Sequence, residues 1–376
     1  MTPTDSFDTA VIGGGLMGCG TALRLARGGR RVVVLERRGL CMEASGVNAG
    51  SLSPMIKRAA LMPYALRSYD MWQNTREWLG GDIEAHRKSG LILAFTEREA
   101  ELLEKMMRER IEAGAPAEMI GGNRAKEIEP SLADGVILAA WSQMDGHGNS
   151  SRTGHVFHHA MTEAGVDIRQ GTTVQGIAKT GAGFEIGTDK GDVRAETVVL
   201  AGGAWLGRMG QWLGVDLPIG CKVNQMSVTE RMPRILSTVV NAQNGLLTMK
   251  QPPNGTVVIG GGWQARGDID MDPGTREIIP GCLTGNVQVA VHAIPAMRQA
   301  RLVRSWIGLE ALTPDMLPLI GPLPGVDGAF VIGACRGGWE IGPCLGEILG
   351  DHMLGREPAL PLFDPGRPQP QARWAA

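Results

Sequence analysis

The chain has 376 residues, of which 43% are hydrophobic and 20% are charged, with a formal net charge of −2. This length exceeds one ordinary domain and fits two. The apolar fraction suffices for a buried core, which excludes a disordered chain. Because the charges nearly balance, the basic excess of a nucleic-acid-binding protein is missing, and we expect a small-molecule partner and no nucleic acid.

The six cysteines indicate reduced thiols rather than a metal site. No two of them have CxxC spacing, so the usual support for zinc or iron–sulfur binding is absent and no metal is expected. The N-terminus does not resemble a signal peptide, and no uninterrupted apolar stretch is long enough to span a bilayer. We therefore expect a cytoplasmic protein without a membrane span.

The N-terminal part of the chain is predicted to form a strand, a glycine turn, a helix, a second strand and two further helices. Short apolar runs predict the strands, and apolar side chains that recur every three or four residues predict the helices. The strands are expected at 8–12 and 31–36, and the helices at 21–29, 61–78 and 97–114.

The remaining elements include a second group of strands and a closing strand–turn–helix unit. A helix is expected at 154–165, two short strands within 167–177, and a buried strand within 194–205 that ends in glycines. Turn-separated strands are expected at 222–230, 245–251 and 255–262, covered by a helix at 275–294 that Pro280 and Gly281 divide, and the closing unit at 329–354 precedes an irregular tail from Glu357.

Residues 13–18, GGGLMG, satisfy the GxGxxG pattern directly after a strand and at the start of a helix. In this pattern Gly13 makes the tight turn, Gly15 lets the backbone approach a pyrophosphate, and Gly18 lets the helix pack on the strand. Glu36 closes the next strand, where a carboxylate accepts hydrogen bonds from ribose hydroxyls and disfavours a 2′-phosphate. A glycine-rich turn without a ligand is the alternative, but the complete context favours a dinucleotide.

Three further segments favour FAD over NAD. Residues 43–54, EASGVNAGSLSP, are small and polar and too irregular for a helix, and small residues let backbone N–H groups reach a ligand. The glycines at 202–203 and within 333–346 return to the same domain. A simple NAD enzyme rarely needs these segments, whereas an FAD buried along its length does.

The nucleotide-type units at the start, middle and end of the chain are separated by β-rich segments, which predicts two domains built from non-adjacent pieces. The fold class is α/β (α+β overall), with a Rossmann-like FAD-binding domain and a second domain of antiparallel sheet and helices. The FAD-binding domain is expected to comprise 1–85, 145–217 and 330–376, and the substrate-binding domain 86–144 and 218–329.

From Val11 to Leu354 the chain resembles the superfamily of FAD-dependent amine oxidoreductases that includes D-amino-acid oxidase, glycine oxidase and sarcosine oxidase. The segments that carry the resemblance are VIGGGLMG, EASGVNAG, VVLAGGAW, RSWIGLEALTPDMLPLIGP and GACRGGWEIGP. The last two are specific and look similar to the beta subunits of sarcosine oxidase and of hydroxyproline or opine dehydrogenases.

The resemblance implies a non-covalent FAD site, since no Cys or His matches a position of covalent attachment. Arg37 would flank the adenine, Val174 would lay its backbone against it, and the helix beginning near Gly337 would point its positive end at the flavin N1–C2=O edge. The implied cofactor-binding residues are Gly13, Gly15, Leu16, Met17, Gly18, Glu36, Arg37, Ser45, Asn48, Ala49, Gly50, Ser51, Val174, Ala201, Gly202, Trp205, Gly337, Gly338, Trp339, Glu340 and Ile341.

One position departs from the family pattern. Members similar to glycine oxidase carry an arginine after the WxGL element to bind the substrate carboxylate, whereas this chain has Glu310. Glu310 either is satisfied by neighbouring backbone or arginine, which we favour, or faces a cationic substrate amine. Arg336 and Arg304 remain as candidate carboxylate ligands, with Lys222 and Lys250 as further candidates. The expected catalytic set is Arg336, Arg304 and Glu310.

The resemblance implies that a hydride passes from the alpha carbon of an amino acid to flavin N5 and that the imine formed is hydrolysed. The missing arginine favours a secondary amine or an N-substituted amino acid, such as sarcosine, proline, hydroxyproline or an opine-like compound. The alternatives are a glycine or D-amino-acid oxidase, a catalytic component of a heteromeric dehydrogenase, a 2-hydroxy acid oxidoreductase, and a non-catalytic FAD-bearing scaffold. Electrons would pass to oxygen or to a partner acceptor, in a homo- or hetero-oligomer.

Overall fold

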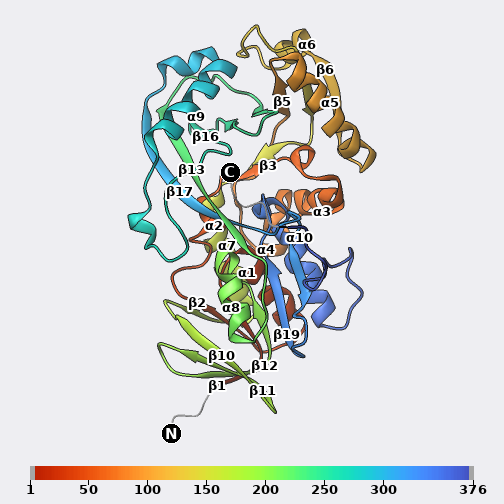
Figure 1. Ribbon diagram of the computed structural model, residues 1–376, viewed down its shortest axis with the longest axis vertical. Helices are drawn as coiled ribbons and strands as arrows, with labels where there is room; N and C mark the ends of the chain where they lie inside the picture. The colour runs from red at the N-terminus through yellow and green to blue at the C-terminus, as the bar shows by residue number, and fades with distance from the viewer. Residues whose placement is uncertain (1–4, 372–376) are drawn as a thin grey trace.

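The computed structural model describes residues 5–371, which form two eight-stranded sheets and one three-stranded sheet (Figure 1). In the first sheet, β1 pairs in parallel with β2 and β12, and these two strands pair in parallel with β9 and β19 respectively. Its strands are β1 (Asp5–Ile12), β2 (Val32–Glu36), β9 (Asp167–Gln170), β10 (Val174–Thr180), β11 (Gly183–Thr188), β12 (Val193–Leu200), β18 (Leu319–Pro322) and β19 (Ala329–Gly333). Val32–Leu35 are almost fully buried, as expected for a parallel strand covered on both faces.

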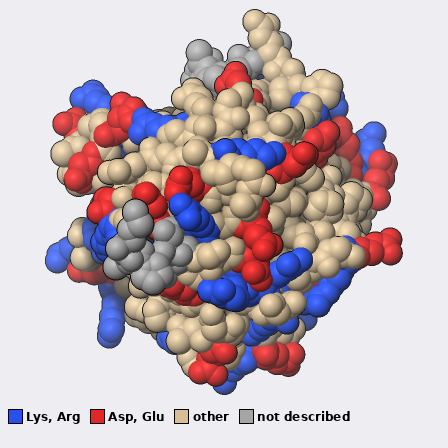
Figure 2. Space-filling view, turned by 90° about the horizontal axis from the view of Figure 1, so that it is seen from below, with Lys and Arg blue, Asp and Glu red and all other residues tan. Residues whose placement is uncertain are grey.

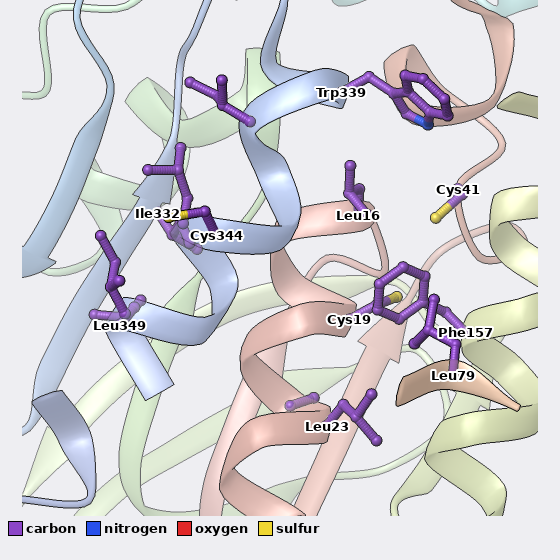
Figure 3. Close-up of a cluster of buried hydrophobic side chains, with 14 of the residues drawn as sticks. Leu16, Cys19, Leu23, Cys41, Leu79, Phe157, Ile332, Trp339, Cys344 and Leu349 are labelled. Carbon is purple, nitrogen blue, oxygen red and sulfur yellow. The ribbon is translucent and has the colours of Figure 1, made fainter. Parts of the chain in front are cut away.

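Four helices pack together beside the first sheet: α1 (Leu16–Arg27), α3 (Met62–Gln73), α7 (Thr153–Glu163) and α10 (Gly338–Met353). Leu16, Cys19 and Leu23 of α1 share a buried cluster with Cys344 of α10 and Phe157 of α7 (Figure 3). This cluster fixes α1, α7 and α10 against one another.

Glycines let α1 and α10 cross at very short range. A Cβ atom added at Gly346 of α10 would lie 3.0 Å from the Cα of Gly20 of α1. One turn away on either side, Gly342 lies against Leu16 and Gly350 against Arg24. The spacing of four residues keeps all three glycines on one face of α10, so this face fixes where the N-terminus of the helix points.

The second sheet is mainly antiparallel and lies in the upper half of Figure 1. Its strand order is β17-β13-β16-β15-β14-β5-β7-β6, with one parallel pair, β14 and β5. The strands are β5 (Gly90–Ala94), β6 (Ala117–Gly121), β7 (Leu138–Ser142), β13 (Gly220–Arg231), β14 (Val239–Ala242), β15 (Thr248–Lys250), β16 (Thr256–Gly260) and β17 (Leu302–Leu312). Helices α5 (Glu97–Glu112), α6 (Gly122–Ile128) and α9 (Pro280–Ala293) pack against it.

The remaining elements are short. The three-stranded sheet consists of β3 (Ser51–Leu52), β4 (His86–Arg87) and β8 (Gly146–His147), and the short helices are α2 (Ala44–Val47), α4 (Thr75–Leu79) and α8 (Leu206–Trp212). Single 3₁₀ turns lie at Pro54–Ile56, Ala59–Leu61, Ser150–Arg152, Gly203–Trp205, Pro273–Thr275 and Pro295–Gln299. No helix within residues 5–371 combines the length and apolar character that crossing a membrane requires.

The predicted α/β fold class is confirmed, and three local predictions are wrong. The helix expected at 61–78 is divided at Asn74, whose side chain donates a hydrogen bond back to the Asp70 carbonyl. The segment 43–54, expected to be irregular, contains the short helix α2. The helix expected at 275–294 begins only at Pro280, because proline fits the first turn of a helix but not its interior.

The segment β18 lies within the range assigned to the substrate domain, but it pairs with β19 in the first sheet. This difference concerns one strand, and the domain ranges themselves stay a prediction. On the face shown in Figure 2, basic and acidic side chains are interspersed, in keeping with the nearly balanced charge.

Candidate active site

A cavity of about 1240 Å³ is lined by residues of both large sheets. It is larger than the roughly 300–1,000 Å³ of a typical small-molecule pocket. At one side the lining is formed by the ends of β1, β2 and β12 of the first sheet. At the other side it is formed by β5 and β14 of the second sheet and by helix α5. The N-terminus of α10 and the loop before β3 contribute the segments between these ends.

The turn between β1 and α1 brings backbone to the cavity. Gly13 has a φ of +111°, and a Cβ there would lie 2.5 Å from the Ala201 carbonyl oxygen, so no other residue fits. Gly15, Leu16 and Met17 line the cavity at the start of α1, where an α-helix presents N–H groups without intrahelical partners. This arrangement suits an anionic group.

Glu36 holds this turn in place at the end of β2. Its Oε2 accepts a hydrogen bond from Gly14 N at 2.7 Å, and its Oε1 accepts one from Arg38 N at 2.8 Å. Each carboxylate oxygen keeps a further lone pair for a hydroxyl donor. Nearby on the lining, the Arg37 guanidinium stacks over the Trp205 ring, 3.8 Å from its centroid.

The loop 44–51 is folded by its own polar side chains. Ser45 Oγ accepts a hydrogen bond from Leu16 N at 3.0 Å, which satisfies one of the first amides of α1. Asn48 Oδ1 accepts from Gly50 N at 2.7 Å, while its Nδ2 donates to the Ala44 carbonyl at 2.9 Å. The backbone of Asn48–Ser51 therefore lines the cavity.

At the other end of the site, Glu310 of β17 binds the start of α10. Its Oε1 accepts a hydrogen bond from Gly337 N, and its Oε2 accepts one from Asn224 Nδ2, both at 3.0 Å. Gly337 has a φ of +63°, the left-handed conformation that suits glycine. Glu310 is therefore bonded within the protein, by one backbone N–H and by the amide side chain of Asn224.

A buried ion pair lies next to this helix start. Lys57 Nζ is 2.8 Å from Glu340 Oε2, with side-chain exposures of 8% and 1%. Lys57 also donates a hydrogen bond to the Gly337 carbonyl at 3.3 Å. Burial raises the pKa of the Glu340 carboxyl, and the charge of Lys57 opposes that rise. Both residues line the cavity.

Comparison with known proteins identifies the family. A family model described as FAD dependent oxidoreductase (DAO) matches residues 8–352.

The chain belongs to the DAO family of FAD-dependent oxidoreductases.

It is similar to a glycine oxidase from Geobacillus kaustophilus, with 29% identity over 368 residues and 96% of each chain covered. It is also similar to one of the subunits of the opine oxidase from Rhizobium meliloti, with 27% identity, covering 88% of this chain and 89% of that one. The crystal structure of glycine oxidase from Geobacillus kaustophilus superposes with a TM-score of 0.85 and 27% identity, covering 95% of this chain and 97% of that one.

This FAD-dependent oxidoreductase acts on CH–NH or CH–NH₂ groups of amino acids, as predicted. The cavity fits the cofactor, because its lining combines a glycine cradle that a Cβ would fill with a carboxylate at the end of β2. The cradle and the first amides of α1 would hold the diphosphate, and Glu36 the ribose.

Most of the site residues predicted for this oxidoreductase come together, and three do not line the cavity: Gly18, Ile341 and Arg304. Gly18 packs under the turn, where a Cβ would lie 2.2 Å from the Gly13 carbonyl oxygen, which is its predicted packing role. Ile341, near the start of α10, is fully buried in the hydrophobic core. The lining residues are Gly13, Gly15, Leu16, Met17, Glu36, Arg37, Ser45, Asn48, Ala49, Gly50, Ser51, Val174, Ala201, Gly202, Trp205, Glu310, Arg336, Gly337, Gly338, Trp339 and Glu340.

Arg304 is misplaced as a carboxylate ligand. It lies six residues before Glu310 on β17, and six residues of extended strand put the two Cα atoms roughly 20 Å apart. Its guanidinium instead stacks over Trp306, 5.2 Å from the ring centroid, in an exposed position. Arg336 and Lys222 do line the cavity, whereas Lys250 is buried and does not.

Several lining residues are not predicted from the sequence. Lys57 and Arg58 follow the segment 43–54, and Arg110 lies on α5, the helix expected at 97–114. Nothing in the sequence separates these three from the rest of the 37 Lys and Arg side chains, because no motif surrounds them. Asn241 and Gln243 come from β14 and its end, a strand that is not predicted either.

Proposed function

We propose that this oxidoreductase oxidises a secondary amine or an N-substituted amino acid. The substrates that we consider are sarcosine-like, proline- or hydroxyproline-like and opine-like compounds, each oxidised at the carbon next to nitrogen to an imine that water hydrolyses. The observation that carries the proposal is Glu310 in place of a carboxylate-binding arginine, with both of its oxygens bonded to the protein. The similarity to the opine oxidase relative supports it.

The bound FAD supplies the hydride acceptor. The protein contributes orientation and electrostatics: Gly337 and Gly338 let backbone come close to a ligand at the start of α10, where the helix dipole stabilises negative charge. Arg336 and Lys222 lie on the lining without an ion pair in residues 5–371, so they are available to a substrate carboxylate. Met226, Met316 and Ile92 add apolar lining that limits water at the reacting carbon.

The carboxylates on the cavity lining already have partners within the protein. Within the described residues the acidic lining side chains are Glu36, Glu43, Glu310 and Glu340, and each has a hydrogen bond or an ion pair in the protein. We infer that the substrate amine loses its proton to water before hydride transfer, so that it reacts in its neutral form without a catalytic base from the protein.

The test is anaerobic reduction of the bound flavin by a panel of amines and hydroxy acids. Bleaching by sarcosine, proline or an N-carboxyalkyl amino acid is the expected result. Reduction only by glycine or primary D-amino acids would favour the second candidate, an oxidase like the relative from Geobacillus kaustophilus. Reduction only by 2-hydroxy acids, or by nothing in the panel, would contradict amine oxidation.

The electron acceptor is decided by a separate measurement on the same preparation. Oxygen consumption by the purified chain at the rate of flavin reduction would indicate that oxygen is the electron acceptor. Slow reoxidation by oxygen, together with rapid reoxidation by an artificial electron acceptor, would instead indicate a dehydrogenase that passes electrons to a partner.

A further inference from the structure

Cationic side chains gather on one part of the cavity wall. Lys57, Arg58, Arg110 and Arg336 line it together with the two carboxylates Glu310 and Glu340, so four positive and two negative charges leave an excess of +2. Lys57 is paired with Glu340. In the part of the chain that the structure describes, Arg58, Arg110 and Arg336 form no ion pair with an acidic group.

Arg110 is held in an apolar environment. It lies on α5, where Leu103 and Met107 are fully buried in a cluster with Met55 and Ile92. Its guanidinium donates one hydrogen bond, at 3.1 Å, to the Met55 carbonyl. Burial, and then the like charge of nearby Arg58, lower the pKa of Arg110 to about 10. Even so, Arg110 stays charged at neutral pH.

Arg58 approaches the same region from the segment between two 3₁₀ turns. Its guanidinium donates to the Asp315 carbonyl at 3.3 Å, a bond that leaves most of its donors free. Both residues line the cavity, and the like charge of the exposed Arg58 acts unfavourably on the half-buried Arg110 guanidinium. An anionic ligand group that binds both guanidinium groups would cancel this repulsion. Each guanidinium presents its N–H donors as a planar fork, which matches the two oxygens of a carboxylate.

We infer that the substrate carries a second carboxylate, bound by Arg110 and Arg58, in addition to the carboxylate next to the reacting carbon. This inference rests on the proposed amine oxidation and narrows the substrate class to dicarboxylic amines. Arg336 and Lys222 remain for the first carboxylate, so each anionic group has its own cations. The second carboxylate sits either on the nitrogen substituent or on the amino-acid side chain.

The direct test measures binding of unreactive ligands to the FAD-loaded protein through the shift of the flavin absorbance. Oxydiacetate has two carboxylates and no C–N bond, and methoxyacetate is its one-carboxylate counterpart. We expect oxydiacetate to bind at least tenfold more tightly. In R110Q that preference is lost, with oxydiacetate binding weakened roughly 10- to 100-fold and methoxyacetate binding changed less than threefold.

R108Q is the matched control, because Arg108 is exposed on the same helix and does not line the cavity. It should leave both affinities unchanged. Equal binding of the two ligands, equal weakening of both by R110Q, or the same loss in R108Q overturns the inference. Thermal melting and flavin content confirm that R110Q is folded. If it is not, R58Q replaces it, and an unchanged oxydiacetate affinity in R58Q is then the overturning result.

The position of the second carboxylate is decided by flavin reduction under anaerobic conditions. Preferred reduction by iminodiacetate over sarcosine places it on the nitrogen substituent. Preferred reduction by either enantiomer of N-methylaspartate places it on the side chain, and a preference for sarcosine over both overturns the inference. If no amine reduces the flavin, the proposed function fails, while the oxydiacetate measurement still decides whether the dicarboxylate site exists.

Discussion

Single residues decide whether the diphosphate cradle forms, and Gly13 is the most constrained of them. Its φ of +111° and the Ala201 carbonyl 2.5 Å from an added Cβ leave no space for a side chain. G13A is expected to lose FAD and to lower the free energy of unfolding by about 2 kcal/mol or more. Flavin absorbance after gel filtration and denaturant unfolding check both effects. G281A, at a glycine with open space around it, should keep its FAD, and retention of FAD by G13A would contradict the account.

Lys250 gives a second prediction at this scale, because its buried amine has no hydrogen-bond partner in the described residues. Burial lowers the pKa of Lys250 to about 7 from its ordinary 10.5. Between these pH values the unfolded chain binds the extra proton, so this group makes the native state more stable as pH rises, by up to about 1.4 kcal/mol per pH unit. K250M removes this dependence.

We therefore expect K250M to be more stable than the parent chain at pH 7.5, by a margin that shrinks as pH rises towards 10. Urea unfolding at a series of pH values and a fixed FAD concentration measures the margin. K105M, which replaces an exposed lysine on α5, serves as the control and should show no such trend. Parallel profiles for K250M and the parent chain would mean that Lys250 is charged and paired in the folded protein.

At the scale of elements, the crossing of α1 and α10 aims the start of α10 at the cavity. Helix propensity alone predicts that G346A raises the free energy of unfolding by up to about 1 kcal/mol, because alanine is the better helix former. Packing predicts the opposite, since the new Cβ would lie 3.0 Å from Gly20 backbone, which neighbouring helices and β1 hold in place. We expect packing to win, with a loss of about 1–3 kcal/mol and weaker FAD binding. Thermal unfolding measures the sign, and a stabilised G346A would show that the helices can separate without cost.

The elements also show how far the sequence allows prediction. The unit β1–α1–β2 is predicted well because its signals are local: an apolar strand, a glycine turn at fixed spacing and a closing Glu36. The short strands β5, β6, β7 and β14 are not predicted, because they have little periodicity and pair with segments far away in the chain. The 11-residue strand β17 is not predicted either. Arg110 is missed although its helix is predicted, because the packing of that helix beside β5 at the cavity depends on the unpredicted strands. Arg304 does not line the cavity although it belongs to the same sequence motif as Glu310. A motif does not show that six residues of extended strand separate the two side chains.

At the scale of the whole molecule, residues of both large sheets line one cavity, so a cofactor bound there would contact both. Binding to the folded state alone stabilises a protein by about 4 kcal/mol at a ligand concentration 1,000 times the Kd. We expect the melting temperature to rise with FAD concentration in a single transition that includes both sheets. Differential scanning calorimetry of the FAD-stripped protein at several FAD concentrations checks this. A melting temperature that does not depend on FAD would contradict binding in this cavity.

The most direct test of the account is a crystal structure of the FAD-loaded protein with oxydiacetate. The account predicts the diphosphate at the first amides of α1, the ribose at Glu36, the flavin beside Gly337 and Gly338, and one ligand carboxylate on Arg110. FAD bound outside the cavity, or the ligand bound away from the start of α10, would contradict it.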